Sequence, residues 1–66
     1  MKAIVISKNA KEYTFIKDCI ANTKGVSNLE VDIINNKFIF DFSTHNIIEG
    51  LREKLIAFGF VVEFIY

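Results

Sequence analysis

The chain has 66 residues, with eight basic and eight acidic side chains that leave no formal net charge. Nucleic-acid binding depends on an excess of Lys and Arg that neutralises phosphates, so this balance argues against a nucleic-acid partner and against an anionic membrane surface. A single cysteine, Cys19, excludes an intrachain disulfide. The length predicts one domain over residues 1–66, near the lower limit for folding without disulfides or metals.

Hydrophobic residues make up 52% of the chain, a high share for a domain this small. The surplus either compensates for the missing disulfides and metals or faces a partner. No apolar stretch approaches the roughly 20 residues that span a bilayer, and the apolar run in residues 1–7 is too short for a signal peptide. With one free thiol and no export signal, the expected location is the cytoplasm.

The first two elements follow from hydrophobic spacing. The run Lys2–Ile6 is apolar and β-branched, which predicts a strand. Over Ala10–Thr23 the apolar side chains recur at the three- and four-residue spacing of a helix, as in Ile16, Cys19 and Ile20. Cys19 on this apolar stripe is therefore expected to be an inert thiol in the core.

A hairpin is predicted where two β-rich runs, Leu29–Ile34 and Lys37–Phe42, flank Asn35-Asn36. Asn tolerates a positive φ and suits a two-residue turn, which fixes the register of the strands. One face of the hairpin is then wholly apolar and lies under the helices: Leu29, Val31, Ile33, Phe38, Phe40 and Phe42. The other face carries Glu30, Asp32, Ile34, Lys37, Ile39 and Asp41.

The outward face of this hairpin gathers carboxylates, because the predicted turn sets Glu30 opposite Asp41, with Asp32 on the same face. Like charges that face each other across a sheet repel. Three carboxylates could hold a hard cation through oxygen. A solvated patch partly neutralised by lysines is the favoured interpretation.

A second helix is predicted over Ile47–Phe58, with Gly59 as its C-terminal cap and Phe60 placed to fold back on the last turn. The final run, Phe60–Tyr66, is rich in aromatic and β-branched residues and predicts a last strand. The order strand, helix, hairpin, helix, strand predicts an α+β fold, the ferredoxin-like βαββαβ sandwich. Its four-stranded antiparallel sheet has the order 4-1-3-2, with both helices on one face.

A set of positions along nearly the whole chain matches the pattern of a known family: Gly25-Val26, Val31–Ile33, Lys37–Phe40, Leu51, Leu55 and Gly59-Phe60. In these positions the chain resembles the heavy-metal-associated domains of copper chaperones and metal pumps. That family often has Gly-Tyr where this chain has Gly59-Phe60. The resemblance implies the same ferredoxin-like fold.

In that family a Met-x-Cys-x-x-Cys loop between the first strand and the first helix binds the metal, because thiolates select soft ions such as Cu(I). Counted back from Gly25, the matching positions are Ser7 for the methionine and Asn9 and Glu12 for the cysteines. No thiolate remains, so the resemblance implies no metal ligand and no cofactor here. Asn9 and Glu12 instead fit a capping box at the helix start, with a hard-cation site or a partner contact as alternatives.

Signals for catalysis and for RNA binding are weak. There is no Ser/His/Asp set and no Gly-rich phosphate loop, so neither an enzyme nor a catalytic residue is predicted. His45, the single histidine, precedes the second helix and is expected to be solvated. The aromatic run Phe38–Phe42 is similar to the third strand of RNA-recognition motifs. Here it faces the helices, and Val5 stands where the partner aromatic of those domains would lie.

The functional hypothesis therefore concerns the surface. The sheet face away from the helices is expected to expose an apolar set: Ala3, Val5, Ile34, Ile39, Val61 and Ile65. The last strand is an edge whose one charge is Glu63, and unprotected apolar edges and faces mark interaction sites. This predicts a non-enzymatic protein-interaction module that binds another protein or a second copy through Val5, Ile39, Val61, Glu63 and Ile65.

Two other functions stay open at this stage. The first is a metal-binding or metal-transport-related protein with altered ligands, which the family resemblance suggests. The second is a small-molecule regulatory module similar to the ACT domains, which share the predicted order of elements.

Overall fold

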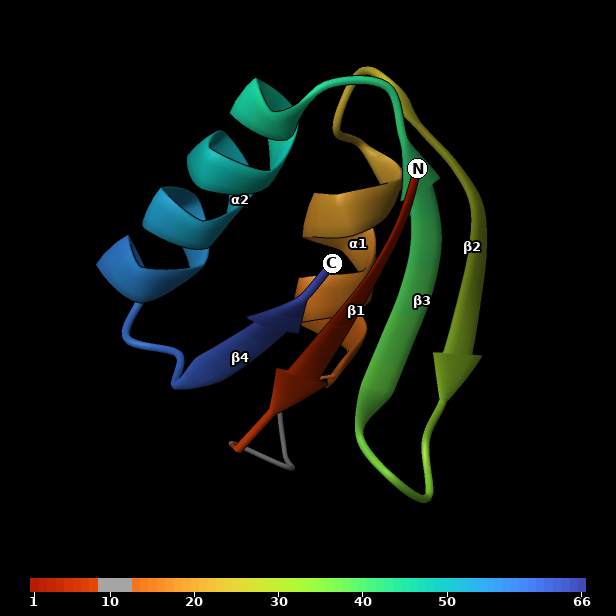
Figure 1. The fold of residues 1–66 in the computed structure, drawn as a ribbon. Helices are drawn as coiled ribbons and strands as arrows, with labels where there is room; N and C mark the ends of the chain where they lie inside the picture. Colours follow the sequence, from red (N-terminus) through yellow and green to blue (C-terminus); the bar gives the residue numbers. More distant parts are fainter. Residues whose placement is uncertain (9–12) are drawn as a thin grey trace.

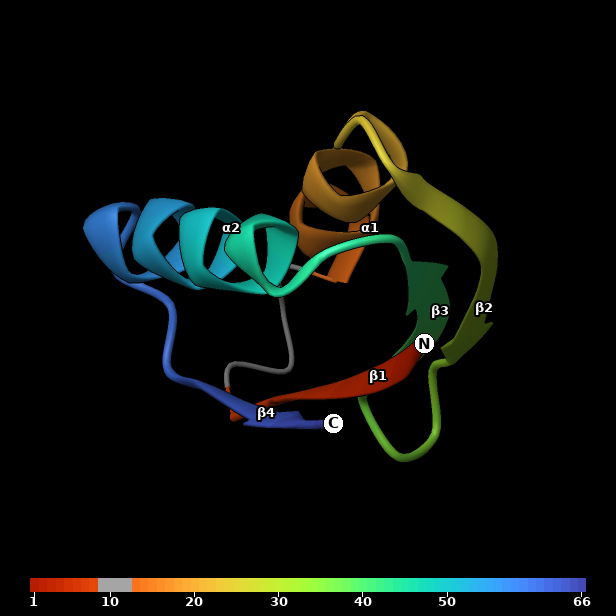
Figure 2. The same cartoon turned by 45° about the horizontal axis from the view of Figure 1, so that its top comes forward.

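The computed structural model describes residues 1–8 and 13–66. Its elements are β1 (Lys2–Ser7), α1 (Tyr13–Ala21), β2 (Val26–Asp32), β3 (Lys37–Phe42), α2 (His45–Ala57) and β4 (Val62–Ile65). The four strands form one antiparallel sheet in the order β2-β3-β1-β4. Both helices lie on the same face of this sheet (Figure 1, Figure 2). The predicted ferredoxin-like βαββαβ fold, with strand order 4-1-3-2, is confirmed.

The core lies between the sheet and the two helices. Phe38 and Phe40 of β3 are 0% exposed, and Phe42 is nearly so, which confirms that the phenylalanines face the helices. The helices bury one stripe each: Ile16, Cys19 and Ile20 from α1, and Ile48, Leu51 and Leu55 from α2. Neither helix, over the residues described, is long and apolar enough to cross a membrane.

The first strand corrects the sequence interpretation. Val5 lies opposite Phe38 and Ala3 lies opposite Phe40, and both small side chains are 0% exposed. Residues opposite each other in an antiparallel pair share a face, so Ala3 and Val5 belong to the core. The expectation that they are exposed on the outer face is wrong. The physical reason is volume, because small side chains fit beside the large phenylalanine rings.

The predicted register of the hairpin is also wrong, by two residues. Val31 lies opposite Phe38 rather than Phe40, and residues 33–36 form the loop between the strands. Because side chains alternate between faces with a period of two, this shift leaves Val31 on the helix side. Ile33 leaves the sheet instead and is 57% exposed.

Side-chain hydrogen bonds at the loop explain the longer connection. The carboxylate of Asp32 accepts a hydrogen bond from the backbone N–H of Asn35 at 3.3 Å and another from its side-chain amide at 2.9 Å. Asn36 then takes a φ of 53°, the left-handed conformation expected for an Asn in this connection. The Asp32–Asn35 pair therefore closes a four-residue loop, so that β2 ends two residues earlier than a two-residue turn would require, while β3 still begins at Lys37.

A β-bulge near the start of β2 changes which face its residues occupy. The register shifts between Ser27 and Glu30, where Asn28 adopts a φ of 54°. One extra residue on this strand moves the residues before it to the opposite face. Val26 consequently lies opposite Phe42 and packs against the core.

The C-terminus of α2 ends as predicted. Gly59, with a φ of 89°, donates its N–H to the carbonyl of Ile56 at 2.9 Å, and Phe60 donates to the carbonyl of Leu55 at 3.1 Å. These two bonds form a Schellman motif, which needs a left-handed residue and therefore favours glycine. Phe60 folds back against the core, and the chain continues into β4, which is shorter than the predicted strand.

Candidate functional site

The sheet face that the helices leave uncovered, here called the open face, carries a row of isoleucines. Ile4 of β1 lies opposite Ile39 of β3 on one side and opposite Ile65 of β4 on the other. These three residues, the isoleucine row, therefore cross three adjacent strands in register. Ile65 is 48% exposed, and Ile4 and Ile39 are partly exposed. Figure 2 shows both helices on the other side of the sheet.

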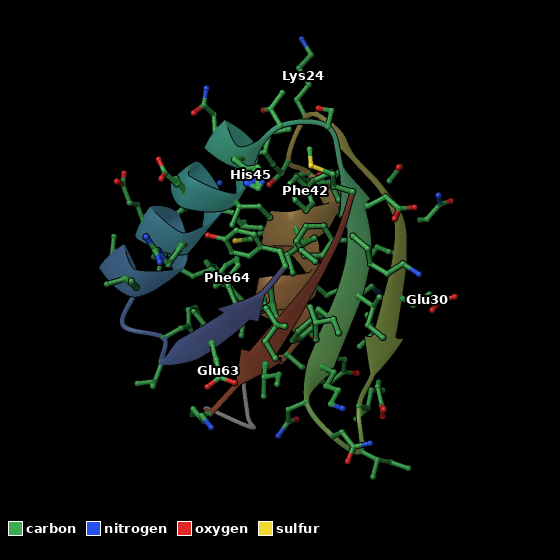
Figure 3. All side chains as sticks on the ribbon, viewed as in Figure 1. Lys24, Glu30, Phe42, His45, Glu63 and Phe64 are labelled. Atoms are coloured by element: carbon green, nitrogen blue, oxygen red, sulfur yellow. The ribbon has the colours of Figure 1, made fainter. Side chains whose placement is uncertain are left out.

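Charged residues border the isoleucine row on both sides. Toward the start of β1, Lys2 lies opposite Asp41. Toward its end, Ile6 lies between Lys37 of β3 and Glu63 of β4. Figure 3 shows Glu63 beside the end of β1. The open face thus has an apolar centre with a mixed charged rim, the usual anatomy of a protein-binding surface.

The structure brings together most of the predicted contact residues and excludes one. Ile39, Glu63 and Ile65 lie on the open face, and Val61, just before β4, is 58% exposed. Val5 is buried under the helices and cannot contact a partner. The sequence interpretation missed Ile4 and Ile6. An available signal was their size, because Ile4 and Ile6 are larger than Ala3 and Val5 and fit less well beside phenylalanine.

Strand β4 is an edge of the sheet, as predicted. Within the described residues it pairs with β1 on one side, and no strand follows it on the other (Figure 1). The backbone carbonyl of Val61 accepts a hydrogen bond from the N–H of Lys8 at 2.8 Å, which extends the pairing with β1 by one residue. The free side of β4 lies next to Ile65, at one end of the isoleucine row.

The predicted acidic patch is not assembled. Glu30 lies opposite Ile39 rather than Asp41, and Asp41 accepts a hydrogen bond from the amide of Asn28 at 2.9 Å. The side-chain hydrogen bond from Asn35 lowers the pKa of Asp32. In the part of the chain that the structure describes, no three His, Cys, Asp or Glu side chains gather as metal ligands would.

The predicted cap residues, Asn9 and Glu12, lie outside the described residues. Ser7, at the position of the family's methionine, is buried at the end of β1, and its N–H donates to the carbonyl of Asn36 at 3.0 Å.

Cys19 is buried in α1, as expected for a core thiol. His45 is exposed and makes edge contacts with the ring of Phe42.

No protein-family model and no curated protein sequence matches the chain. Solved structures match its fold. Oxidized MerP from Ralstonia metallidurans CH34 aligns with 100% of this chain and 97% of its own, with a TM-score of 0.78 and 13% identity. The copper-binding domain of HMA7, a P-type ATPase, covers 98% and 93%, with a TM-score of 0.74 and 20% identity. The CsoZ metallochaperone covers 100% and 97%, with a TM-score of 0.71 and 12% identity.

These comparisons define the class of the fold. The chain has the ferredoxin-like fold of the heavy-metal-associated domains, over its full length. The resemblance expected from Gly25-Val26 and Gly59-Phe60 is confirmed at the level of that fold.

Proposed function

We propose that this chain is a non-enzymatic protein-interaction module that binds its partner through the open face and the adjacent edge of β4. The observation that supports the proposal is the isoleucine row, in which three strands present Ile4, Ile39 and Ile65 in register where no helix covers them. Single exposed apolar side chains are ordinary on a protein surface. A contiguous apolar patch with a polar rim marks an interaction site.

Strand formation alone does not require isoleucine at these positions. Exposed strand positions are well served by Thr, which shares the β-branched shape, and charged residues at such positions discourage aggregation. The isoleucine row instead keeps three large apolar side chains together at the surface. Their burial by a partner supplies a favourable hydrophobic free energy, about 25 cal/mol for each Å² of apolar surface removed from water.

The size of the molecule limits the interface. Its two larger extents are 28 and 23 Å, so one face offers about 600 Å² to a partner. An interface of about 1,200 Å² in total is at the lower end of specific complexes.

The test compares two open-face variants with a matched control. Ile39→Lys and Ile65→Lys place a charge in the isoleucine row, whereas Ile34→Lys makes the same change in the hairpin loop, at a residue that is 92% exposed. Partners are recovered from the native cell extract, identified, purified and titrated with each variant. Both open-face variants should weaken binding of the identified partner at least tenfold, and Ile34→Lys should not. Equal binding by all three variants would overturn the proposal.

A second candidate function is metal handling, which is favoured by the copper-binding description of the HMA7 domain and by the metallochaperone CsoZ. A soft ion such as Cu(I) needs thiolate ligands. The chain has one cysteine, and Cys19 is buried in α1. A metal site in this chain would therefore use oxygen ligands or the imidazole of His45, and would select a harder cation than Cu(I).

Titration with Cu(I) and Zn(II) separates the two functions. The interaction role predicts that Cu(I) binds no tighter than to an isolated thiol, and that a competing chelator removes it. The Cys19→Ser variant serves as the control for that thiol. A stoichiometric complex that survives the chelator, with NMR shifts in residues 7–12, would support metal handling instead.

A further inference from the structure

We infer that the free edge of β4 accepts an antiparallel strand of another protein that carries Lys or Arg opposite Glu63 and apolar side chains two residues to either side. This inference rests on the proposed function and specifies the chemistry of the partner. Pairing with an exposed sheet edge draws its affinity from main-chain hydrogen bonds and its specificity from alternate side chains.

The hydrogen-bond pattern identifies the backbone groups available at this edge. Because Val61 accepts a hydrogen bond from Lys8 in line with β1, its carbonyl points toward β1. In an antiparallel strand the N–H and C=O of one residue point the same way, and the direction alternates along the chain. Glu63 and Ile65 therefore also bond toward β1. Val62 and Phe64 direct their N–H and C=O groups toward the free edge, where an added strand would meet them.

The same pattern places Glu63 close to an incoming side chain. A residue whose backbone bonds point away from the added strand belongs to a non-hydrogen-bonded pair, in which the two Cα atoms are about 4.5 Å apart. On its other side Glu63 lies directly opposite Ile6, and the nearest basic residue along that strand, Lys8, lies only diagonally from it, opposite Val61. A basic side chain on the added strand would supply the opposite charge that favours cross-strand pairing.

Along its own strand, the neighbours of Glu63 that share its face are apolar. Ile65 and Val61 are 48% and 58% exposed and stand two residues to either side of it. Because strand residues two apart share a face, an added strand presents its apolar residues to these two and its basic residue to Glu63. The edge thus favours an apolar-x-basic-x-apolar segment.

A second copy of the chain fits this edge less well. Residues 61–66 contain no Lys or Arg, so no register of β4 against itself gives Glu63 a cation. The symmetric register centred on Glu63 sets two carboxylates opposite each other. The register centred on Phe64 sets each Glu63 against Ile65. Glu63 therefore acts as the charge that discourages self-pairing at this edge, a common protection of edge strands.

Whole chains provide a direct test. Sedimentation equilibrium is measured for the wild type, for the Glu63→Lys variant, and for their equimolar mixture. Each chain alone should sediment at the monomer mass of 7.6 kDa, whereas the mixture should form a heterodimer of about twice that mass. In the mixture the introduced lysine faces Glu63, and Val61 faces Ile65. The control is Glu49→Lys, the same charge change at an exposed position of α2, which should not associate with the wild type.

Peptides complete the test and separate this inference from the proposed function. A peptide of residues 60–66 with Glu63→Lys should bind the wild type at least tenfold tighter than the native peptide, with NMR shifts in β4. The preference should reverse on the Glu63→Lys chain. Equal binding of both peptides, or a wild type that dimerises as strongly as the mixture, would overturn the inference.

If the edge tests fail while Ile39→Lys still abolishes partner binding, the open face remains the site. If Ile39→Lys and Ile65→Lys both leave partner binding intact, the proposed function itself is wrong.

Discussion

At the middle of the sheet, both faces carry apolar residues, and these serve different purposes. Val5 is 0% exposed under the helices, while its neighbour Ile4 lies on the open face and is partly exposed. Along β3, Phe38 and Phe40 are buried and Ile39 between them contributes to the isoleucine row. At the middle of the sheet, hydropathy therefore does not distinguish the two faces, and the charged residues of the open face lie around the isoleucine row. Shape does distinguish them, because the covered face combines small and large side chains there and the isoleucine row repeats a single one.

The strongest test of this contrast is Phe40→Ala. Phe40 is 0% exposed at the centre of the covered face, and removing a buried phenylalanine ring costs about 3–5 kcal/mol. A domain of this size has a total stability of roughly 5 kcal/mol. The variant should therefore retain at most about 2 kcal/mol of stability, and urea denaturation monitored by circular dichroism should show a midpoint far below that of the wild type. A cooperative transition at the wild-type midpoint would show that Phe40 is not central to the core.

Two glycines test the same difference between packed and exposed positions. A Cβ added at one of them would meet packed side chains, whereas a Cβ added at the other would meet open space. Gly25 has a φ of 92°, and a Cβ there would overlap Cδ1 of Ile47 and lie 2.9 Å from Oγ of Ser43. Gly25→Ala should therefore destabilise the fold by about 2–4 kcal/mol.

Gly50 lies within α2, and a Cβ there meets nothing within 4 Å. Gly50→Ala should stabilise the protein by about 1 kcal/mol. Thermal unfolding of both variants checks these opposite signs.

A matched pair of threonine substitutions compares the faces at adjacent residues. Val5→Thr places a hydroxyl in the core, where an unsatisfied polar group costs about 1–3 kcal/mol. Ile4→Thr keeps the β-branched shape on the open face, where water can bind the hydroxyl, and should cost less than about 1 kcal/mol. Denaturant midpoints give both values. Equal losses from the two substitutions would mean that the open face is as closely packed as the covered one.

The smallest expected effect concerns the hairpin loop, away from both faces. The side-chain hydrogen bond from Asn35 lowers the pKa of Asp32 below its ordinary value of 3.8 in the folded chain. The ionised carboxylate therefore favours folding above about pH 4, and this contribution is lost as the pH falls below that value. Asp32→Asn should reduce the loss of stability between about pH 5 and about pH 2. An unchanged pH profile would show that the Asp32–Asn35 pair contributes nothing to folding.

The order of elements could be predicted from the sequence because it depends on local patterns. The helical spacing of Ile16, Cys19 and Ile20 and the Gly59-Phe60 pair are signals within a few residues, and the structure confirms both elements. The faces of β1 could not be predicted in the same way. Every residue of Ala3–Ile6 is apolar, so alternation carries no information there, and the pairing of Val5 with Phe38 is a contact between distant segments.

The candidate site could be predicted in part. Ile39 and Ile65 were assigned to the open face from strand parity, and their positions agree with that assignment. The hairpin register failed because the Asp32–Asn35 hydrogen bonds and the left-handed Asn28 each shift the strand pairing. A two-residue turn at Asn35-Asn36 and a longer loop closed by Asp32 and Asn35 are both compatible with the sequence pattern. The pattern alone therefore does not choose between the two strand registers.

The placement of β1 between β3 and β4 has a consequence for how the chain folds. Ile4 pairs with Ile39 and also with Ile65, so the middle of the sheet joins segments from opposite ends of the sequence. Contacts between distant segments form late, because the chain entropy lost in closing a long loop is recovered only when they are complete. During synthesis β4 emerges after every other strand. Until it docks, β1 is itself an edge strand, with Ile4 and Ile39 side by side on the open face, the kind of transient surface on which partly folded chains associate.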